Sequence, residues 1–223
     1  MNKSALNARL LSAAEFVRQD ATFADIGTDH AYLPIQLVKT GKCSKVYACD
    51  IRRGPLAIAE ENIRNAGYTR QIPVILSDGF EYVPMDTDCV VIAGMGVYTG
   101  VGILEKALNR LSLLKEIIVQ VNDDVPVLRE WISDHGYTIL EEDIVTDKKH
   151  TYMIVVFSAD DHSGYSDEEI LFGPVLLQKK DPVFLQYWQA RKQFLEQVLP
   201  MKKPAEKPAV VKEIEMIAGM LES

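Results

Sequence analysis

The chain has 223 residues, of which 48% are hydrophobic and 25% are charged. This composition is ordinary for a globular protein and excludes a largely disordered chain. The longest apolar run, 152–157, is far shorter than the roughly 18 residues that cross a bilayer. Asn7 and Arg9 interrupt the apolar N-terminus, so we expect no signal peptide either. The three cysteines lack a C-x-x-C spacing and the four histidines lack ligand spacing, which predicts a reduced, cytoplasmic protein without a structural metal.

The charge is unevenly distributed. The net charge of −8 argues mildly against a nucleic acid as partner. Residues 1–158 carry 16 basic and 21 acidic side chains, whereas 179–212 carries eight basic and three acidic ones. Such a basic segment can hold a phosphate backbone locally, although it can equally be the solvated surface of a helical hairpin.

Apolar patterns along the chain alternate between those of strands and those of helices. The expected strands are 22–26, 45–49, 72–76, 89–93 and 117–121, followed by β segments at 137–145 and 151–157. The expected helices are 4–17, 31–40, 54–66, 103–111 and 126–135. This alternation predicts an α/β fold, a doubly wound and mostly parallel sheet with helices on both faces. The last two β segments are joined too tightly for a helical crossover, so the terminal strand should be antiparallel.

The C-terminal part changes character after a polar stretch at 158–166, where we place a boundary between domains 1–160 and 166–223. Beyond it, apolar residues at 184, 188, 195 and 198 mark one face of a helix. A second helix has apolar residues at 210, 214, 217 and 221, a spacing typical of a coiled-coil seam. Prolines 200, 204 and 208 separate the two. We therefore expect an α-helical, coiled-coil-like hairpin.

The loop after the first strand predicts the class of cofactor, because open parallel sheets bind ligands beyond the carboxyl ends of their strands. The loop has Gly27 but lacks the further glycines, at 29 and 32, of a dinucleotide-binding turn. Asp29 stands there instead, and an anion about 4 Å from a phosphate costs roughly 4 kcal/mol at an effective dielectric of about 20. The loop therefore favours a cationic cofactor such as S-adenosylmethionine, whose ammonium could donate to Asp25 or Asp29. Alternatively, Asp29 merely caps the following helix.

Two further carboxylates follow the next strands. Asp50 ends the second strand, just before Ile51, where an acidic residue bonds a ribose diol. Asp78, within Ser77-Asp78-Gly79 after the third strand, could accept from an adenine amino group, or it could simply belong to a turn before glycine. Carboxylates at three successive strand ends indicate such a cofactor site much more specifically than any one of them does alone.

Several short motifs resemble one family. They are Gly27-Thr28-Asp29-His30-Ala31-Tyr32-Leu33-Pro34, Gly54-Pro55, Gly94-Met95-Gly96, Phe172-Gly173-Pro174, and Asp181-Pro182-Val183-Phe184 with Trp188. These are similar to signatures of the bacterial tRNA adenine-N1 methyltransferases that modify position 22. The resemblance covers nearly the whole chain. It implies a Rossmann-like methyltransferase domain, a C-terminal coiled-coil-like domain, S-adenosylmethionine as methyl donor and tRNA as acceptor. Together with the loops above, it places at the cofactor Asp25, Gly27, Asp29, Asp50, Ile51, Ser77, Asp78, Gly79, Gly94, Met95 and Gly96.

Two positions depart from the family pattern. Val97 stands where a further glycine usually follows Gly-Met-Gly, and Val121 replaces the proline of a Gln-Pro-Asn sequence after the fifth strand. Both loops are expected to border the pocket for the target base.

The catalytic hypothesis depends on orientation, since unprotonated adenine N1 is already a nucleophile. We expect Asn122, Asp29 and the Gly94–Gly96 backbone to position the base edge. His30 is either a general base or a structural histidine bonded to a neighbouring backbone carbonyl. Tyr32 and Tyr98 could stack on the base. The side chains expected to track tRNA phosphates are Lys179, Lys180, Arg191, Lys192, Lys202 and Lys203.

Two alternatives remain open at this point. One is an NAD-dependent oxidoreductase, which Asp29 and the missing glycines disfavour. The other is a non-catalytic RNA-binding protein with a vestigial cofactor pocket, which the Val97 departure keeps open. The sequence does not specify an oligomeric state.

Overall fold

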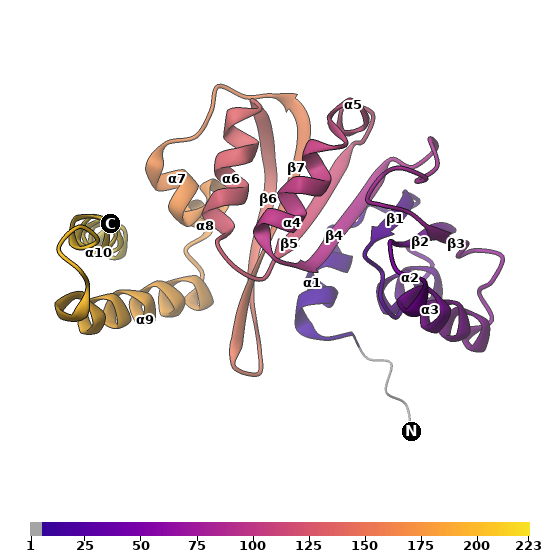
Figure 1. Cartoon of the computed structure of the whole chain (residues 1–223), viewed down its shortest axis with the longest axis horizontal. Helices are drawn as coiled ribbons and strands as arrows, with labels where there is room; N and C mark the ends of the chain where they lie inside the picture. Colours follow the sequence, from indigo (N-terminus) through magenta and orange to yellow (C-terminus); the bar gives the residue numbers. More distant parts are fainter. Residues whose placement is uncertain (1–5) are drawn as a thin grey trace.

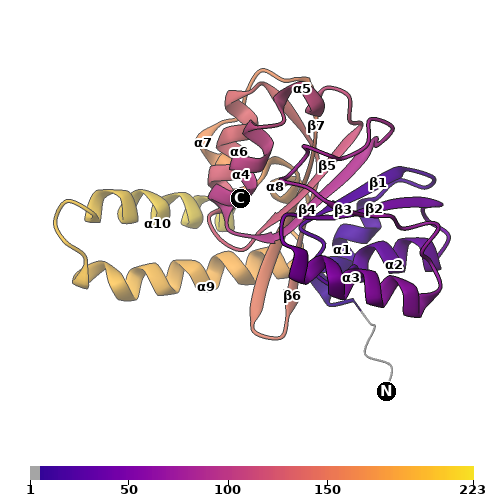
Figure 2. The ribbon, with the colours of Figure 1, turned by 45° about the vertical axis from the view of Figure 1, so that its right-hand side comes forward.

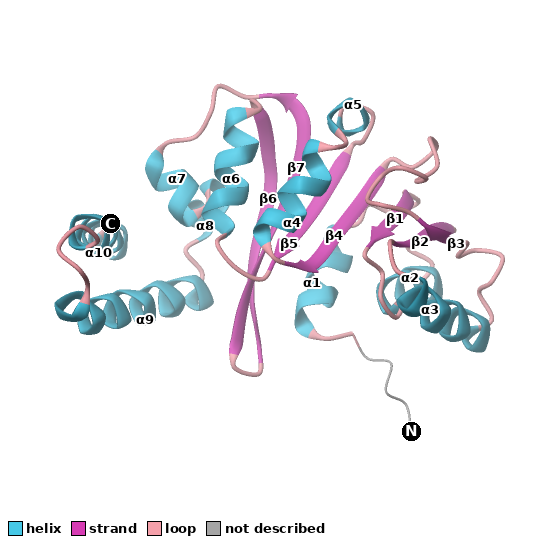
Figure 3. Ribbon diagram, viewed as in Figure 1, coloured by secondary structure: helices cyan, strands magenta, loops and turns pink. Residues whose placement is uncertain are grey.

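One mixed sheet forms the centre of the molecule (Figure 3). The computed structural model describes residues 6–223, so the first residues of the expected helix 4–17 lie outside it. Within that range the strands are β1 (Thr22–Ile26), β2 (Lys45–Asp50), β3 (Val74–Leu76), β4 (Cys89–Met95), β5 (Glu116–Val121), β6 (Tyr137–Asp147) and β7 (His150–Asp161). Their order is β3-β2-β1-β4-β5-β7-β6. Strands β1 to β5 are parallel, and β7 is antiparallel to both neighbours, which confirms the predicted fold class.

Helices cover both faces of this sheet (Figure 1). One face carries α1 (Ala8–Phe16), α2 (Tyr32–Lys39) and α3 (Arg53–Ala66), and the other α4 (Val97–Glu105), α5 (Leu108–Leu111) and α6 (Val125–Asp134). Side chains of β4 alternate between the two layers, with Cys89 and Val91 in one core and Val90 and Ile92 in the other. Burial on both faces accounts for the continuous apolar runs of these strands.

The start of α4 corrects the prediction of one helix over 103–111. The structure continues β4 to Met95 and begins α4 directly afterwards at Val97, whose backbone N–H donates to Asp123 Oδ1 at 2.7 Å. Two glycines early in this helix conceal it in the sequence. One of them, Gly100, lies so close to β5 that a Cβ there would stand 3.3 Å from Val121 Cγ1. Close packing of helix on strand therefore outweighs the low helix propensity of glycine.

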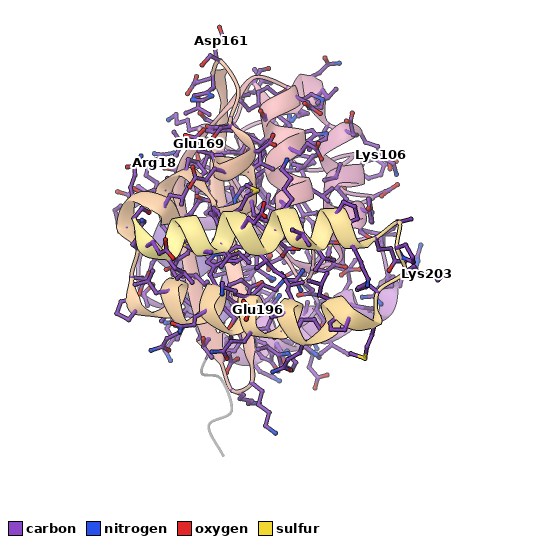
Figure 4. The ribbon with its side chains drawn as sticks, turned by 90° about the vertical axis from the view of Figure 1, so that its left-hand side faces the viewer. Arg18, Lys106, Asp161, Glu169, Glu196 and Lys203 are labelled. Carbon is purple, nitrogen blue, oxygen red and sulfur yellow. The ribbon has the colours of Figure 1, made fainter. Side chains whose placement is uncertain are left out.

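The C-terminal residues form a helical arm (Figure 2). Its elements are α7 (Asp167–Phe172), α8 (Pro174–Lys179), α9 (Pro182–Val198), the 3₁₀ turn η1 (Leu199–Met201) and α10 (Lys207–Glu222). Helices α9 and α10 lie side by side and antiparallel (Figure 4), as the expected hairpin requires. The expected apolar face of α9 is buried at Phe184, Trp188 and Leu195.

A buried ion pair joins this arm to the sheet layer. Arg129 of α6 and Glu142 of β6 are fully buried, with Nε and Oε1 2.7 Å apart. Arg129 Nη1 also donates to the carbonyl of Leu171 at the end of α7, and Glu142 Oε2 accepts from the N–H of Val175 in α8. Between these helices Gly173 has a φ of +94°, and a Cβ there would collide with Glu142 and lie 2.7 Å from Arg129 Nη2. The Phe-Gly-Pro motif is thus a packing requirement.

Several elements differ in length from their predictions, among them two strands. Strand β3 begins at Val74, two residues later than expected, and β7 continues to Asp161, into the polar stretch assigned to a boundary. Helices α7 and α8 contact α6 and β6. The division into 1–160 and 166–223 stays a prediction. None of the helices from residue 6 onward is both long and apolar enough to cross a membrane.

Candidate functional site

A cavity of about 780 Å³ opens at the carboxyl ends of β1 to β4. It lies where the strand order reverses between β1 and β4, the position at which open α/β sheets bind ligands. The predicted site residues that line it are Asp25, Gly27, Asp29, His30, Tyr32, Asp50, Ile51, Ser77, Asp78, Gly79, Gly94, Met95 and Tyr98. Gly96 and Asn122 lie next to the cavity without lining it. The structure therefore brings together nearly all residues expected at the cofactor.

The loop after β1 has an unusual backbone. Gly27 has a φ of +82°, and a Cβ there would collide with the methyl group of Met95. Asp29 and Ala31 also adopt positive φ, at 47° and 56°, which costs a residue with a side chain roughly 1–2 kcal/mol. Ala31 is the N-cap residue of α2, so the alternative that Asp29 caps this helix is wrong. The strained loop instead holds Asp29 and His30 at the cavity.

Asp25 forms the floor of the cavity. It is 6% exposed, and burial raises its carboxyl pKa to about 7. The hydrogen bond from Thr28 Oγ1, at 2.8 Å, and the charge of Arg9 oppose this rise, whereas Asp50 adds to it. Near neutral pH, Asp25 is therefore partly ionised, and a cation placed beside it would favour the ionised form.

The other two carboxylates each keep an oxygen available. Asp50 is 4% exposed, and its Oδ1 accepts from the backbone N–H of Arg52 at 2.8 Å. Asp78 is more exposed, and its Oδ2 accepts from Lys106 Nζ at 2.9 Å. Ser77 has a structural role, since its Oγ donates to the carbonyl of Gly79 and closes the turn.

His30 lies at the mouth of the cavity. Its Nε2 is 3.4 Å from Asp29 Oδ2, and its ring stacks on Tyr32 with a centroid separation of 5.3 Å. The backbone carbonyl of His30, rather than the ring, takes part in the hydrogen bond from Asn62 Nδ2. The second aromatic residue of the mouth, Tyr98 at the start of α4, is 75% exposed. A flat π-surface is thus available where a base would enter.

Arg9 is a cavity residue that sequence analysis missed. It reaches from the first turn of α1 to donate to Gln120 Oε1, which also accepts from the N–H of Gly94 at 3.0 Å. Burial lowers the pKa of the guanidinium. A Cβ on Gly94 would stand 2.6 Å from Arg9 Nη1, so glycine at this position leaves room for the arginine. No local pattern links residues more than a hundred positions apart, so this contact could not be read from the sequence.

Arg9 also differs from the other basic residues of the cavity in its lack of a nearby carboxylate among residues 6–223. Three other basic side chains line it, and each lies near a carboxylate: His30 near Asp29, Arg52 near Asp50 and Lys106 near Asp78. Across residues 6–223, Arg9 has no carboxylate within 4.0 Å. It is therefore the cation best placed to receive an anionic group.

The loops after β4 and β5 are tied together. Asn122 Nδ2 donates to the carbonyl of Gly94 at 3.0 Å, and its backbone N–H donates to that of Met95. The departures Val97 and Val121 are both buried side chains of the core, and neither lines the cavity. These substitutions therefore leave the cavity wall intact.

Most of the predicted phosphate-binding side chains have acidic partners or carbonyl acceptors. Lys179 lies 3.0 Å from Glu141, Arg191 2.8 Å from Glu213, Lys192 2.6 Å from Glu196 and Lys202 3.9 Å from Glu206. Lys180 donates to the carbonyl of Met220 and to Ser223. In the part of the chain that the structure describes, Lys203 has no carboxylate within 4.0 Å.

Metal ligation is not indicated by the geometry. Over residues 6–223, no three His, Cys, Asp or Glu side chains are grouped so that they could hold a metal ion. Cys43, Cys49 and Cys89 are buried and unbridged, and burial raises the pKa of each thiol.

Comparisons with known proteins show which family this chain resembles. The sequence profile described as tRNA (adenine(22)-N(1))-methyltransferase matches residues 23–219. The Bacillus subtilis tRNA (adenine(22)-N(1))-methyltransferase is 32% identical over 89% of this chain and 86% of its own. The Streptococcus pneumoniae protein Sp1610, solved in complex with S-adenosyl-L-methionine, shares 34% identity at a TM-score of 0.90, over 97% of this chain and 100% of that one.

A second structure extends the comparison to the reaction product of the donor. Mycoplasma capricolum TrmK, solved with S-adenosyl-homocysteine, shares 31% identity at a TM-score of 0.87, over 97% of this chain and 98% of that one. The matches run through both the sheet and the helical arm. On this evidence the chain belongs to the family of tRNA (adenine(22)-N(1))-methyltransferases.

Proposed function

We propose that the cavity is where this S-adenosylmethionine-dependent tRNA adenine-N1 methyltransferase holds its donor, and that the target is adenine 22. The observation that carries the proposal is the placement of three carboxylates, at the ends of β1, β2 and β3, around one cavity of about 780 Å³. Its mouth is lined by His30, Tyr32 and Tyr98. A tRNA substrate also implies that the enzyme works in the cytoplasm.

The residues present fit the chemical groups of this donor. The buried Asp50 keeps Oδ2 available for a ribose diol, and Asp78 keeps Oδ1 available for an adenine amino group. Asp25 and Asp29 are anionic acceptors for an ammonium. Arg9, the cavity cation without a carboxylate neighbour among residues 6–223, would receive the carboxylate of the donor.

The chain contributes orientation and electrostatics to the reaction. The donor supplies an electrophilic methyl group on a sulfonium, and adenine N1 supplies a lone pair. Holding two such reactants in line is worth roughly 7–11 kcal/mol in favourable cases. Asp29, exposed at the mouth, would steady the positive charge that 1-methyladenine acquires. Asn122 would act indirectly, because its amide group holds the Gly94 carbonyl.

On this mechanism, His30 orients more than it transfers protons. The His30→Ala variant should lose less than about tenfold in turnover, whereas a loss beyond about 10⁴-fold would assign it an acid–base role.

In this proposal the helical arm contacts RNA through a lysine at its tip that has no carboxylate partner among residues 6–223. Lys203 lies at the end of the arm, between α9 and α10 (Figure 4). Lys179, Lys180, Arg191, Lys192 and Lys202 would have to exchange their present partners for phosphates.

The direct test is methyl transfer to unmodified tRNA. The protein is incubated with labelled S-adenosylmethionine and a tRNA transcript, and the methylated position is mapped. A matched transcript with guanine in place of adenine 22 should remain unlabelled. Donor binding without any transfer to tRNA would contradict the proposal and favour a non-catalytic protein.

A further inference from the structure

The β6–β7 hairpin extends beyond the rest of the sheet (Figure 3). Strand β5 pairs with β7 only at residues 155–157, whereas β6 and β7 stay paired to the turn, where Asp147 opposes His150. Because β6 runs in the same direction as β5, this turn lies at the carboxyl edge of the sheet. The hairpin therefore projects from the edge at which the cavity opens.

The stem of the hairpin adjoins the cavity wall. The guanidinium carbon of Arg9 lies 5.7 Å from the ring centroid of Tyr152 in β7, and Arg9 lines the cavity. Ser12 of α1 donates to Asp143 of β6, which fixes the helix against the hairpin. From Tyr152 to the turn is three or four residues, about 10 Å at roughly 3.3 Å per residue. The turn is thus near the entrance of a substrate but outside the donor site.

The turn presents two lysines and a histidine to the solvent. Lys148, Lys149 and His150 are all exposed. Neither lysine has a carboxylate within 4.0 Å in the chain from residue 6 to its end. By contrast, Lys179 and Lys192 of the helical arm are paired with acidic groups at 3.0 and 2.6 Å.

The backbone of the turn gives an independent reason to assign it a function. Lys148 has a φ of +57°, in a two-residue turn where glycine, asparagine or aspartate is the favoured residue. A lysine there keeps its charge at the tip at a conformational cost. Strain of this kind is often retained where the side chain serves binding.

We propose that the hairpin turn formed by Lys148, Lys149 and His150 binds the phosphate backbone of tRNA beside the target nucleotide. This inference rests on the proposed function, since it assumes a tRNA substrate at the cavity. Phosphate contacts by lysine position a nucleic acid without reading its sequence. The hairpin would then hold the strand while the base enters between His30, Tyr32 and Tyr98.

The test compares two double variants with the same change in charge. K148A/K149A removes the turn cations, and K45A/K115A removes two exposed lysines at the start of β2 and just before β5, at the opposite edge of the sheet. The measurements are the Kd for unmodified tRNA at several salt concentrations, the Kd for S-adenosylmethionine and kcat at saturating tRNA. K148A/K149A should weaken tRNA binding roughly tenfold and reduce the magnitude of its salt slope by about 1–2. Donor affinity and kcat should stay as in the wild type.

A glycine variant separates the charge from the shape of the turn. K148G relieves the positive φ, so it should raise Tm slightly or leave it unchanged while it still weakens tRNA binding. If K148A/K149A binds tRNA no more weakly than K45A/K115A, the inference is wrong, even though wild-type protein methylates tRNA. If the wild type neither binds nor methylates tRNA, the proposed function fails together with this inference. The first result concerns only the turn variants, whereas the second is seen in the wild type, so the two failures can be told apart.

Discussion

The cations of the helical arm and those of the carboxyl edge are used differently. Lys179 and Arg191 of the arm lie within about 3 Å of Glu141 and Glu213, acidic residues outside the segment 179–212 whose charge suggested an RNA surface. Arg9 and the turn lysines have no such neighbours among residues 6–223. Counting the charges along one segment therefore overestimates the number of basic side chains that remain available to a ligand.

Substitution of a buried cavity carboxylate should have the largest effect on ligand binding. Asp50→Ala removes a buried acceptor of the ribose diol, and hydrogen bonds to a charged group are each worth roughly 1.5–3 kcal/mol. We expect a rise of about 10²- to 10³-fold in the Kd for S-adenosylmethionine, measured by calorimetry. Asp86→Ala is the control, because Asp86 pairs with Lys45 and neither residue lines the cavity. Equal effects in both variants would remove Asp50 from the donor site.

Arg9 should give the next largest effect. Arg9→Ala should weaken donor binding roughly 10- to 30-fold, since it removes a charge-assisted pair. The specific readout uses S-adenosylmethionine and its decarboxylated analogue. Wild-type protein should prefer the carboxylated compound, and Arg9→Ala should bind both alike. A preference that survives the substitution would contradict the assignment of Arg9 to the carboxylate.

Asp25 predicts a dependence of donor affinity on pH. Its pKa of about 7 lies above the ordinary value, so its anionic form is lost as pH falls through 7. We expect the Kd for S-adenosylmethionine to rise roughly tenfold between pH 8 and pH 6. Asp25→Asn should bind more weakly and lose this dependence, whereas His30→Ala should retain it. A dependence that disappears in His30→Ala would assign the titration to the histidine.

The raised pKa of Asp25 affects the free energy of unfolding in the opposite direction from donor affinity: stability falls as pH rises. Because the folded-state pKa of Asp25 is raised, its contribution to folding is fully present below the unfolded-state value near 4 and is lost as pH rises through 7. Asp25→Asn without ligand should therefore lose less stability than the wild type between pH 5 and pH 8, measured by urea unfolding. Identical slopes would mean that another group controls this range.

The smallest effect should come from the arm. Lys192→Ala removes a lysine whose ammonium lies 2.6 Å from Glu196, and we expect less than a twofold change in the Kd for tRNA. Lys203→Ala, without a carboxylate partner among residues 6–223, should weaken binding about threefold. A larger loss for Lys192→Ala would reverse the distinction between paired and unpaired cations.

The sheet could be predicted from the sequence, because strands and helices alternate along the chain. The position of the three carboxylates around one cavity follows from it, since successive parallel strands end at the same edge, whereas their role at the donor stays a prediction. It missed α4, since Gly100 suits close packing against Val121 and hides the helical pattern. It also missed Arg9, whose partner Gln120 is remote in the chain. The oxidoreductase and non-catalytic alternatives could not be excluded from residues alone. Family membership decides for the methyltransferase.

Gly173 has a consequence for how a nucleotide is selected. With the Arg129–Glu142 pair filling the space where a side chain would lie, the chain at this point has little freedom to pivot. The end of α7 and the start of α8 are thus held against the sheet layer at this point. We expect the enzyme to select its adenine partly by the distance along the tRNA between the arm and the cavity, rather than by reading the bases around the adenine.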